Sequence, residues 1–324
     1  MLTVYLDQMK WIDLARAYHG DPRGEPFKDV LELAIHAVKN DLARFPLATM
    51  HYMETWKKRD EGSRYRLAEV MAMLSRFETM AGAKDIFKLE VDLALHDFFG
   101  LRRQAEETRI FGRGVAHAFG KHLEIQLPDH PEIPSFIQER IRFSLWRLKE
   151  FWVIGGYRPT KSIPAIDPQA YTGYSRDFQD AEQELVRVMK DTGATASERQ
   201  NVALIRSLTE IWQLIQEFRS NEIDFEMLVS LGALGLKEFL RSMPSRFVSY
   251  ELQRLRYEDM NLPRKDGDLI DLAALSFGIA YCDVVVTERQ WQHLVKRTKL
   301  EELYGTVVLS DLRELSPILV RGSI

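Results

Sequence analysis

The sequence has few of the residues and runs that mark several common classes of protein. It holds one cysteine, Cys282, in 324 residues, which excludes an internal disulfide and a cysteine-based zinc site and fits a reducing cytoplasm. No apolar run is long enough to span a bilayer, and MLTVYLDQMK at the N-terminus lacks the basic start and long apolar run of a signal peptide. Neither a GxxxxGK[ST] loop nor a GxGxxG turn occurs, so the usual phosphate cradles of nucleotide-binding domains are missing. We therefore expect a cytoplasmic protein with no membrane partner.

The balance of charge is slightly acidic. Apolar residues make up 45% of the chain and charged residues 28%, with a net charge of −4, which is typical of a folded globular protein. This balance argues against a protein that binds nucleic acid mainly through one large basic face. It does not exclude a nuclease, because carboxylates gathered around metal ions lower the net charge while basic residues elsewhere contact phosphates.

The first 56 residues alternate between strand and helix patterns. The short apolar run Leu2–Leu6 predicts a buried strand, and apolar residues at helical spacing from Met9 predict a helix that stops at Gly20. A second amphipathic helix is expected over residues 27–42, followed by a second strand over residues 45–50. The same alternation returns after Pro244, with a helix over 268–280, a strand over 283–287, a helix over 289–304 and a strand over 305–310.

Residues 57–244 differ from both ends of the chain. They repeat apolar side chains at helical spacing, with no convincing strand, and a Gly-, Pro- and Tyr-rich loop is expected over residues 155–176. Alternating strands and helices favour a parallel sheet. We therefore predict an α/β fold in which residues 1–56 plus 245–324 form a parallel sheet flanked by helices, and residues 57–244 form a mostly α-helical insertion.

Acidic residues recur where the predicted strands end. Asp7 closes the first strand, Glu54 lies just beyond the second, and Glu288 follows the third, while Asp271 lies on the helix that leads into the third strand. In parallel sheets, functional groups collect at this edge. Carboxylates brought together need cations between them, and Mg²⁺ or Mn²⁺ prefers such oxygen ligands. We treat Asp268, three residues before Asp271, as a further candidate catalytic residue.

Each of these acids also has a structural explanation. An Asp that closes an apolar run is a common helix cap, which would account for Asp7, and Asp268 stands where a helix N-cap is expected. Taken singly, Glu54 and Glu288 are typical of solvated side chains. The metal-site hypothesis rests on the recurrence of acids at corresponding ends of alternating elements.

Basic residues adjoin these acids in the sequence. The candidates for contact with a nucleic-acid backbone are Lys57 and Lys58 after Glu54, and Arg254, Arg256 and Arg264 before Asp268. Tyr250 or Tyr257 could stack on a base, although solvated helix faces explain such runs equally well. Between residues 140 and 152, basic residues interleave with aromatic ones. We expect that segment to be an amphipathic helix packed in the core first, and an RNA-binding surface second.

Three segments together resemble the PilT N-terminal (PIN) domain, a family of metal-dependent nucleases. They are VYLDQMKWIDLA from Val4, FPLATMHYMET from Phe45, and GDLIDLAALSFGIAYCDVVVTE from Gly267. The resemblance implies that Asp7, Glu54 and Asp271 bind metal, with Glu288 where the family usually has Asp. Thr287 resembles the family's small hydroxyl residue, which supports the acids, and we group it with the substrate-binding candidates. Gln8 and Met9 replace the family's usual Ser or Thr followed by Asn.

The resemblance also implies a function. It is hydrolysis of phosphodiester bonds by metal-activated water with Mg²⁺ or Mn²⁺, leaving a 5′-phosphate and a 3′-hydroxyl, with RNA a commoner substrate than DNA. A toxin of a toxin–antitoxin pair or a phage-defence effector fits this class by analogy. The alternatives are a DNA nuclease and a catalytically degenerate module that binds RNA or protein. An antitoxin or other protein partner, and homo-oligomerisation, are left open by the sequence.

Overall fold

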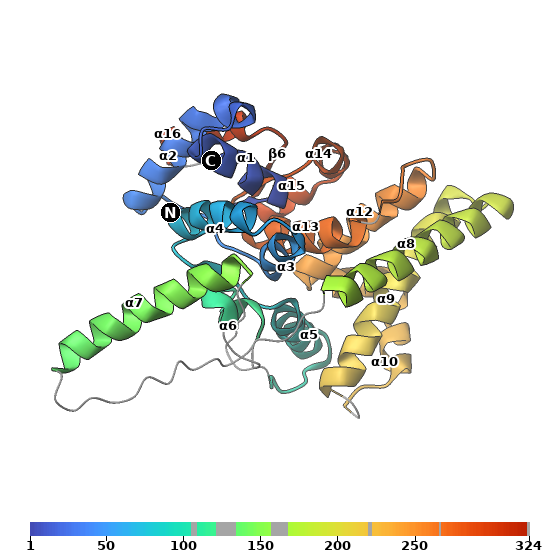
Figure 1. Cartoon of the computed structure of the whole chain (residues 1–324). Coiled ribbons are helices and arrows are strands. Elements are labelled where there is room, and N and C mark those ends of the chain that lie inside the picture. The colour runs from blue at the N-terminus through green and yellow to red at the C-terminus, as the bar shows by residue number, and fades with distance from the viewer. Residues whose placement is uncertain (105–108, 121–133, 157–167, 220–221, 266, 323–324) are drawn as a thin grey trace.

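The computed structural model describes residues 1–104, 109–120, 134–156, 168–219, 222–265 and 267–322, with the backbone alone for 168–175. Within these residues, helices surround one small parallel sheet (Figure 1). The sheet has the order β2-β1-β5-β6, and every neighbouring pair is parallel. Its strands are β1 (Leu2–Leu6), β2 (Ala43–Arg44), β5 (Val284–Val286) and β6 (Val307–Leu309). The prediction of a parallel sheet flanked by helices is confirmed.

Helices account for most of the remaining described chain. Those near the N-terminus are α1 (Gln8–Tyr18), the 3₁₀ helix η1 (Pro22–Phe27), α2 (Lys28–Lys39) and α3 (Thr49–Lys57). The middle of the chain holds α4 (Glu61–Ser75), α5 (Ala83–Phe99), α6 (Gly114–Ala118), α7 (Ser135–Ile154), α8 (Pro168–Asp191), α9 (Ala196–Arg219), α10 (Phe225–Ser230) and α11 (Gly232–Arg241). The last are α12 (Pro244–Glu258), α13 (Asp268–Tyr281), α14 (Arg289–Lys296), α15 (Leu300–Tyr304), the 3₁₀ helix η2 (Leu312–Leu315) and α16 (Ser316–Arg321).

The central strand β1 is buried on both faces. Successive side chains of a strand point to opposite faces, and here Val4 and Leu6 enter a core shared with α1, α2 and α4, while Tyr5 enters a second core with α12 and α13. A strand buried on both faces has a nearly continuous apolar sequence, which is why LTVYL could be predicted as a strand. Gly278 lets α13 approach this second face closely, since an added Cβ would lie 3.2 Å from the Tyr5 ring.

The second strand and its surroundings differ from the prediction. A strand over residues 45–50 is wrong: the strand is the two-residue β2, and α3 already begins at Thr49. Leu47 instead makes a single bridge to Thr79 of β3 (Glu78–Met80), which pairs antiparallel with β4 (Phe111–Arg113). The expectation of no strand in the middle region is therefore wrong too. Strands of three residues are too short to show an alternating pattern.

Three further expectations meet different outcomes. The loop over residues 155–176 is wrong from Pro168 onward, where α8 begins, and its residues 157–167 lie outside the described part of the chain. The helix over 289–304 is split into α14 and α15. The helix over 140–152 exists as α7, and only its C-terminal part joins the core: Trp146 and Phe151 pack against it, and the buried residues are Glu150, Val153 and Ile154. Its N-terminal part projects from the body (Figure 1).

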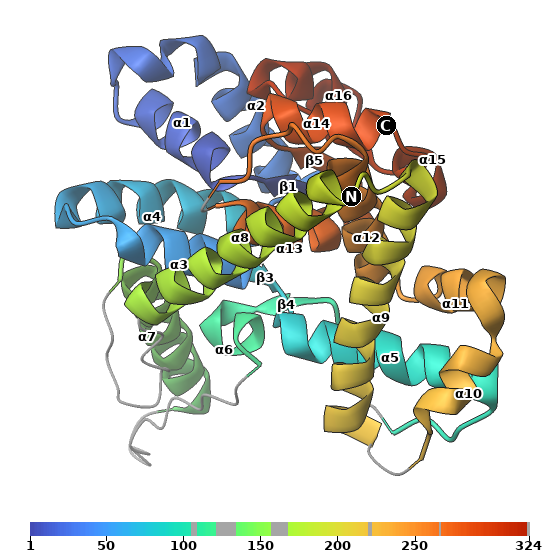
Figure 2. The same cartoon turned by 90° about the vertical axis from the view of Figure 1, so that its right-hand side faces the viewer.

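The middle region shares its packing with the sheet. Leu67 and Met71 of α4 lie in the same core as Val4, while Ile211 of α9 lies in the same core as Tyr5. Helix α8 packs against both α3 and α13 (Figure 2). The predicted boundaries fall at the end of α3 and the start of α12, and the division into two units stays a prediction. Among the described helices, none has the length and apolar composition that a membrane span requires.

Candidate metal centre

Three of the four predicted metal ligands line one small pocket. Asp7 follows β1, Glu54 lies on the second turn of α3, and Asp271 lies in the first turn of α13; together with Thr287 after β5 they surround a space of about 10 Å³. That is about the volume needed for one water-sized probe. The parallel strands bring Asp7 and Thr287 to the same edge of the sheet, and the two helices supply the other acids. The sequence thus predicted a cluster that only the fold assembles.

Asp7 occupies the N-cap position of α1 without acting as a cap. Its backbone N–H donates to the Val286 carbonyl at 2.9 Å, which extends the β1–β5 pairing by one residue. Its carboxylate makes no capping hydrogen bond. The Thr287 hydroxyl donates to Asp7 Oδ2 at 3.5 Å, a long contact that agrees with a supporting role for this threonine. The carboxylate therefore lies near the pocket without a capping hydrogen bond, and the backbone N–H groups of Gln8 and Met9 lower its pKa.

Glu288 lies beside the pocket and does not line it. It is the N-cap residue of α14, and its side chain likewise makes no capping hydrogen bond. Its negative charge reaches the cluster, because it raises the pKa of both Asp7 and Asp271. The longer Glu side chain thus stands at the rim, close enough to interact electrostatically with the lining acids.

The lining acids are partly buried and repel one another. Burial is the largest cause of the raised pKa of Glu54, which reaches about 7, and the charges of Asp7 and Asp271 add to it. The pKa of Asp271 is also raised to about 7, by burial first and by Asp7 next. Burial, followed by the Glu288 charge, raises the pKa of Asp7. Among the described residues, none of these four acids forms an ion pair within 4.0 Å, so their charges lack a cationic partner in contact.

The ligand atoms of this cluster suit a hard divalent cation, but the distances between the side chains do not. All four side chains offer carboxylate oxygens, the ligands that Mg²⁺ and Mn²⁺ prefer. Across the described residues, however, no three His, Cys, Asp or Glu side chains are spaced to hold one ion. A cation would have to draw the acids inward by side-chain rotation.

Two residues that sequence reasoning missed fix the positions of the acids. Buried His51, one turn before Glu54 on α3, accepts the Ala48 N–H on Nδ1 at 2.9 Å and donates from Nε2 to the Leu6 carbonyl at 2.8 Å. Burial lowers its pKa to about 4, so the ring is neutral. Trp291 of α14 donates its indole N–H to Asp271 Oδ2 at 3.0 Å. In the sequence, only the position of His51 three residues before Glu54, within FPLATMHYMET, could have indicated that it lies near the acids.

Asp268 is held by an arginine outside this pocket. It is the first helical residue of α13, so the N-cap position belongs to Gly267, and the predicted cap is displaced by one residue. Its Oδ2 accepts from Arg256 Nη2 at 2.7 Å and from the Lys265 N–H at 2.8 Å. Both side chains of this ion pair are buried. This geometry is that of a structural ion pair, and Asp268 is not among the residues that line the acid pocket.

The three arginines predicted to contact substrate are engaged by the fold. Arg256 also lies over the Trp291 ring, 5.4 Å from its centre. Arg254 pairs with Glu251 at 2.7 Å and with Glu258. Arg264 donates to the backbone carbonyl of Arg256 at 2.7 Å. The structure does not bring these guanidinium groups to the acid pocket, and their contact with substrate stays a prediction.

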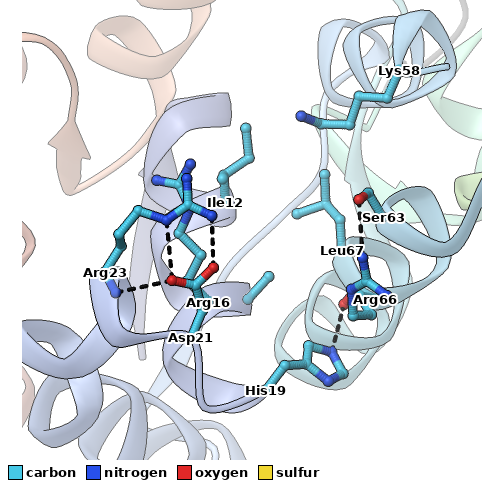
Figure 3. Close-up of a pocket in the computed structure, with 10 residues that line it drawn as sticks. Ile12, Arg16, His19, Asp21, Arg23, Lys58, Ser63, Arg66 and Leu67 are labelled. Carbon is cyan, nitrogen blue, oxygen red and sulfur yellow. Dashed lines mark hydrogen bonds and ion pairs between the residues drawn. The ribbon is translucent and has the colours of Figure 1, made fainter. Parts of the chain in front are cut away.

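Lys57 and Lys58 remain close to the acids, and both lower the pKa of Glu54. Lys57 is exposed at the end of α3. Lys58 reaches into a second pocket of about 210 Å³ between α1, η1 and α4 (Figure 3). The polar residues that line this basic pocket are Arg16, His19, Asp21, Arg23, Lys58, Ser63 and Arg66.

Most cations of the basic pocket have acidic or hydroxyl partners. Arg16 pairs with Asp13 at 2.9 Å, Arg23 with Asp21 at 2.7 Å, and Arg66 donates to Ser63 at 3.0 Å. No described side chain accepts a hydrogen bond from the Lys58 ammonium. Lys58 is four residues beyond Glu54, or about 6 Å along a helix axis. Of the cations that line this pocket, Lys58 is therefore the one without a described side-chain partner, and it follows Glu54 closely in the sequence.

Comparison with known proteins adds no relative: no protein-family model, no curated protein and no solved structure matches this chain.

Proposed function

We propose that the protein is a metal-dependent endonuclease that hydrolyses phosphodiester bonds, with RNA as its substrate. The observation that carries this proposal is the gathering of Asp7, Glu54 and Asp271 in one buried pocket, with Glu288 at its rim and no ion-pair partner among the described residues. Buried charges of one sign are costly unless they are neutralised. A divalent cation would neutralise them, and the choice of RNA rests on the resemblance to PIN domains.

The residues then take separate roles. Asp7, Glu54 and Asp271 would hold the ion, with Glu288 reaching in from the rim, and Thr287 and Trp291 would orient Asp7 and Asp271 through their hydrogen bonds. When bound, such an ion activates water and stabilises the leaving oxygen in phosphodiester hydrolysis. Lys58 would contact a phosphate of the substrate strand on the side of the basic pocket.

The first test is cleavage by the purified full chain. Total RNA and, separately, duplex and single-stranded DNA are incubated with the protein in Mn²⁺, Mg²⁺ or EDTA. We expect RNA cleavage that EDTA abolishes and that Asp7→Asn reduces by about 100-fold or more. The matched control is Asp29→Asn, the same change at an exposed position of α2 outside both pockets, which should cleave normally. Equal cleavage by Asp7→Asn and the unsubstituted protein would assign the activity elsewhere.

The spacing of the acids favours a second candidate, a non-catalytic module that binds RNA or protein. The described acids do not form a coordination sphere without rearrangement, as expected if the site has lost its ion. Melting with and without Mn²⁺ separates the two, because a ligand that binds only the folded state raises the melting temperature. No Mn²⁺ effect and no cleavage, with RNA binding retained, would establish the module.

A further inference from the structure

The basic pocket between α1, η1 and α4 has the size and charge of a ligand site. Its volume is about 210 Å³, against about 10 Å³ for the acid pocket, so it has room for an organic group and not only for an ion. Its lining includes four cations, Arg16, Arg23, Lys58 and Arg66, and one acid, Asp21. The arginine, lysine and aspartate side chains of the lining therefore leave an excess of three positive charges.

The cations come from two walls that face each other across the pocket (Figure 3). One wall is formed by α1 and η1, which carry Arg16 and Arg23, and the other is α4 with Arg66. Gly24 allows η1 to lie against α1, because an added Cβ would stand 2.1 Å from the backbone nitrogen of Ala17. This close packing fixes the part of the wall from which Arg23 extends.

The acid of the lining is used to orient an arginine. Asp21 accepts the Arg23 backbone N–H at 2.9 Å, which caps η1, and its carboxylate also accepts from Nε at 3.0 Å and from Nη2 at 2.7 Å of the same arginine (Figure 3). Such a bidentate pair fixes the plane of the guanidinium group. A guanidinium has five N–H donors, so Arg23 keeps donors for a second anion.

The cations on the opposite side are held loosely. Arg66 Nη2 lies 3.6 Å from Asp60 Oδ2, and both side chains are exposed, so this pair contributes little to stability and a ligand can replace it. The Lys58 side chain points into the space between the walls (Figure 3), and no described side chain accepts a hydrogen bond from it. An anion that enters here would meet charges that the fold has not fully neutralised.

The shape and lining of the pocket favour a terminal phosphate over a strand that passes through. At the end away from Lys58, His19 joins the two walls by donating from Nε2 to the Arg66 carbonyl at 3.1 Å (Figure 3). Ile12 and Leu67 add an apolar surface that a sugar or base can contact. A phosphate monoester carries almost two negative charges and three terminal oxygens, which suits an excess of cations on two walls better than a phosphodiester with one charge.

We propose that the basic pocket binds a phosphate monoester, either the 5′-terminal phosphate of an RNA strand or the phosphate of a free nucleotide. Arg23 and Arg66 would hold the phosphate from opposite walls, and Lys58 would contact it from the side towards Glu54. The strand end as a source rests on the proposed nuclease function, since that reaction itself leaves 5′-phosphates. Binding of a phosphate monoester does not rest on it, because no residue of the acid pocket takes part.

The test measures binding to the full chain in EDTA, where the proposed nuclease cannot cleave. The probes are an RNA of about eight nucleotides with a 5′-phosphate, the same RNA with a 5′-hydroxyl, AMP and adenosine. Fluorescence anisotropy of a 3′ label reports the RNAs, and calorimetry reports the two small molecules. In at least one of the two pairs, we expect the phosphorylated member to bind about tenfold more tightly or better.

The joint change Lys58→Gln and Arg66→Gln should reduce this preference to about twofold or less. It leaves the contact of His19 intact, since that contact uses the Arg66 backbone. The matched control is Lys39→Gln with Arg241→Gln, which removes the same charges at exposed positions that line neither pocket. The control should keep the full preference, and melting temperatures show whether both variants are folded.

The pair of probes that shows the preference identifies the source. A preference for phosphorylated RNA assigns the pocket to strand ends, and a preference for AMP over adenosine with none between the RNAs assigns it to a free nucleotide. No preference in either pair would overturn the proposal, as would a preference that survives Lys58→Gln with Arg66→Gln. Failure of the nuclease proposal is distinguishable, because it appears as absent metal-dependent cleavage by a protein that still prefers the phosphorylated probe in EDTA.

Discussion

Buried acids in the helical middle of the chain differ from those at the edge of the sheet. Asp92 on α5 is paired with buried Arg219, and Glu182 on α8 is paired with Arg206 and accepts from the Tyr257 hydroxyl at 2.6 Å. Asp7, Glu54 and Asp271 are partly buried, yet within the described chain no arginine or lysine forms an ion pair with them. The fold thus neutralises the first set by itself but not the second.

Glu150 shows that burial alone does not define a site. Its pKa is raised to about 7 by burial, as for Glu54, but it stands alone and accepts the Val115 N–H. An isolated carboxyl can become neutral by taking up a proton. Several carboxylates around one pocket also repel one another, and that mutual repulsion distinguishes the acid pocket from Glu150.

The largest expected effect comes from removing an arginine partner. Arg219→Met removes the buried guanidinium that pairs with Asp92, which keeps the longer contact with Arg103 at 3.9 Å and the Gln104 N–H. The change should lower the free energy of unfolding by about 3 kcal/mol, as measured by urea denaturation. Arg187→Met is the matched control, since its pair with Glu184 is fully exposed and should contribute little to stability. Equal losses in the two variants would remove the distinction between buried and exposed pairs.

Asp268 and Asp271, on the same turn of α13, should separate stability from activity. Asp268→Asn weakens the buried pair with Arg256 and should cost about 2 kcal/mol of stability, with cleavage by the folded fraction retained. Asp271→Asn should abolish cleavage with little loss of stability. Denaturation and cleavage assays on both variants test this, and loss of cleavage in a fully folded Asp268→Asn protein would place Asp268 in the site.

Neutralising the acid pocket should stabilise the protein in EDTA. Glu54→Gln with Asp271→Asn removes two repelling charges and should raise the free energy of unfolding at pH 8 by about 1–2 kcal/mol. The value is discounted because both side chains are partly exposed. The control is Glu61→Gln with Asp29→Asn on neighbouring helices, which should change stability little. A destabilised double variant would mean that the acids hold the fold together.

The smallest expected effect is a dependence of stability on pH, which bound metal should reduce. Glu54 and Asp271 titrate near pH 7 in the folded protein but near their ordinary values of 4.5 and 3.8 when unfolded. The folded state therefore holds protons that the unfolded state has released, so stability falls as pH rises from about 4 to 7 and then levels off. Melting in EDTA at pH 5 and 8 checks the fall, with Glu54→Gln/Asp271→Asn as the flatter reference. Mn²⁺ should stabilise most at pH 8, where the acids are ionised.

The elements that could be predicted from the sequence are those in which the apolar pattern matches the burial of the side chains in the fold. LTVYL and DVVVT read as strands because both faces are covered, and the helices at Lys28–Lys39 and Asp268–Tyr281 read from their apolar spacing or length. The candidate acids could be selected because Asp7 and Glu288 directly follow such strands. The supporting role expected for Thr287 came from the resemblance to PIN domains and not from the strand pattern.

Tertiary structure decided the rest. Glu54 was expected after a strand and lies on a helix, because the Ala48 N–H donates to His51 and starts α3 at Thr49. Arg256 and Asp268 could not be paired from sequence, since each resembles a solvated residue until α12 and α13 pack together. The interleaved aromatic residues of α7 predicted a core helix, and the structure confirms this for Trp146 and Phe151 but not for exposed Phe143. The local sequence pattern determines whether a segment forms a helix or a strand. Which charged residues pair, and which helix faces are buried, depends on contacts between segments that are distant in the sequence.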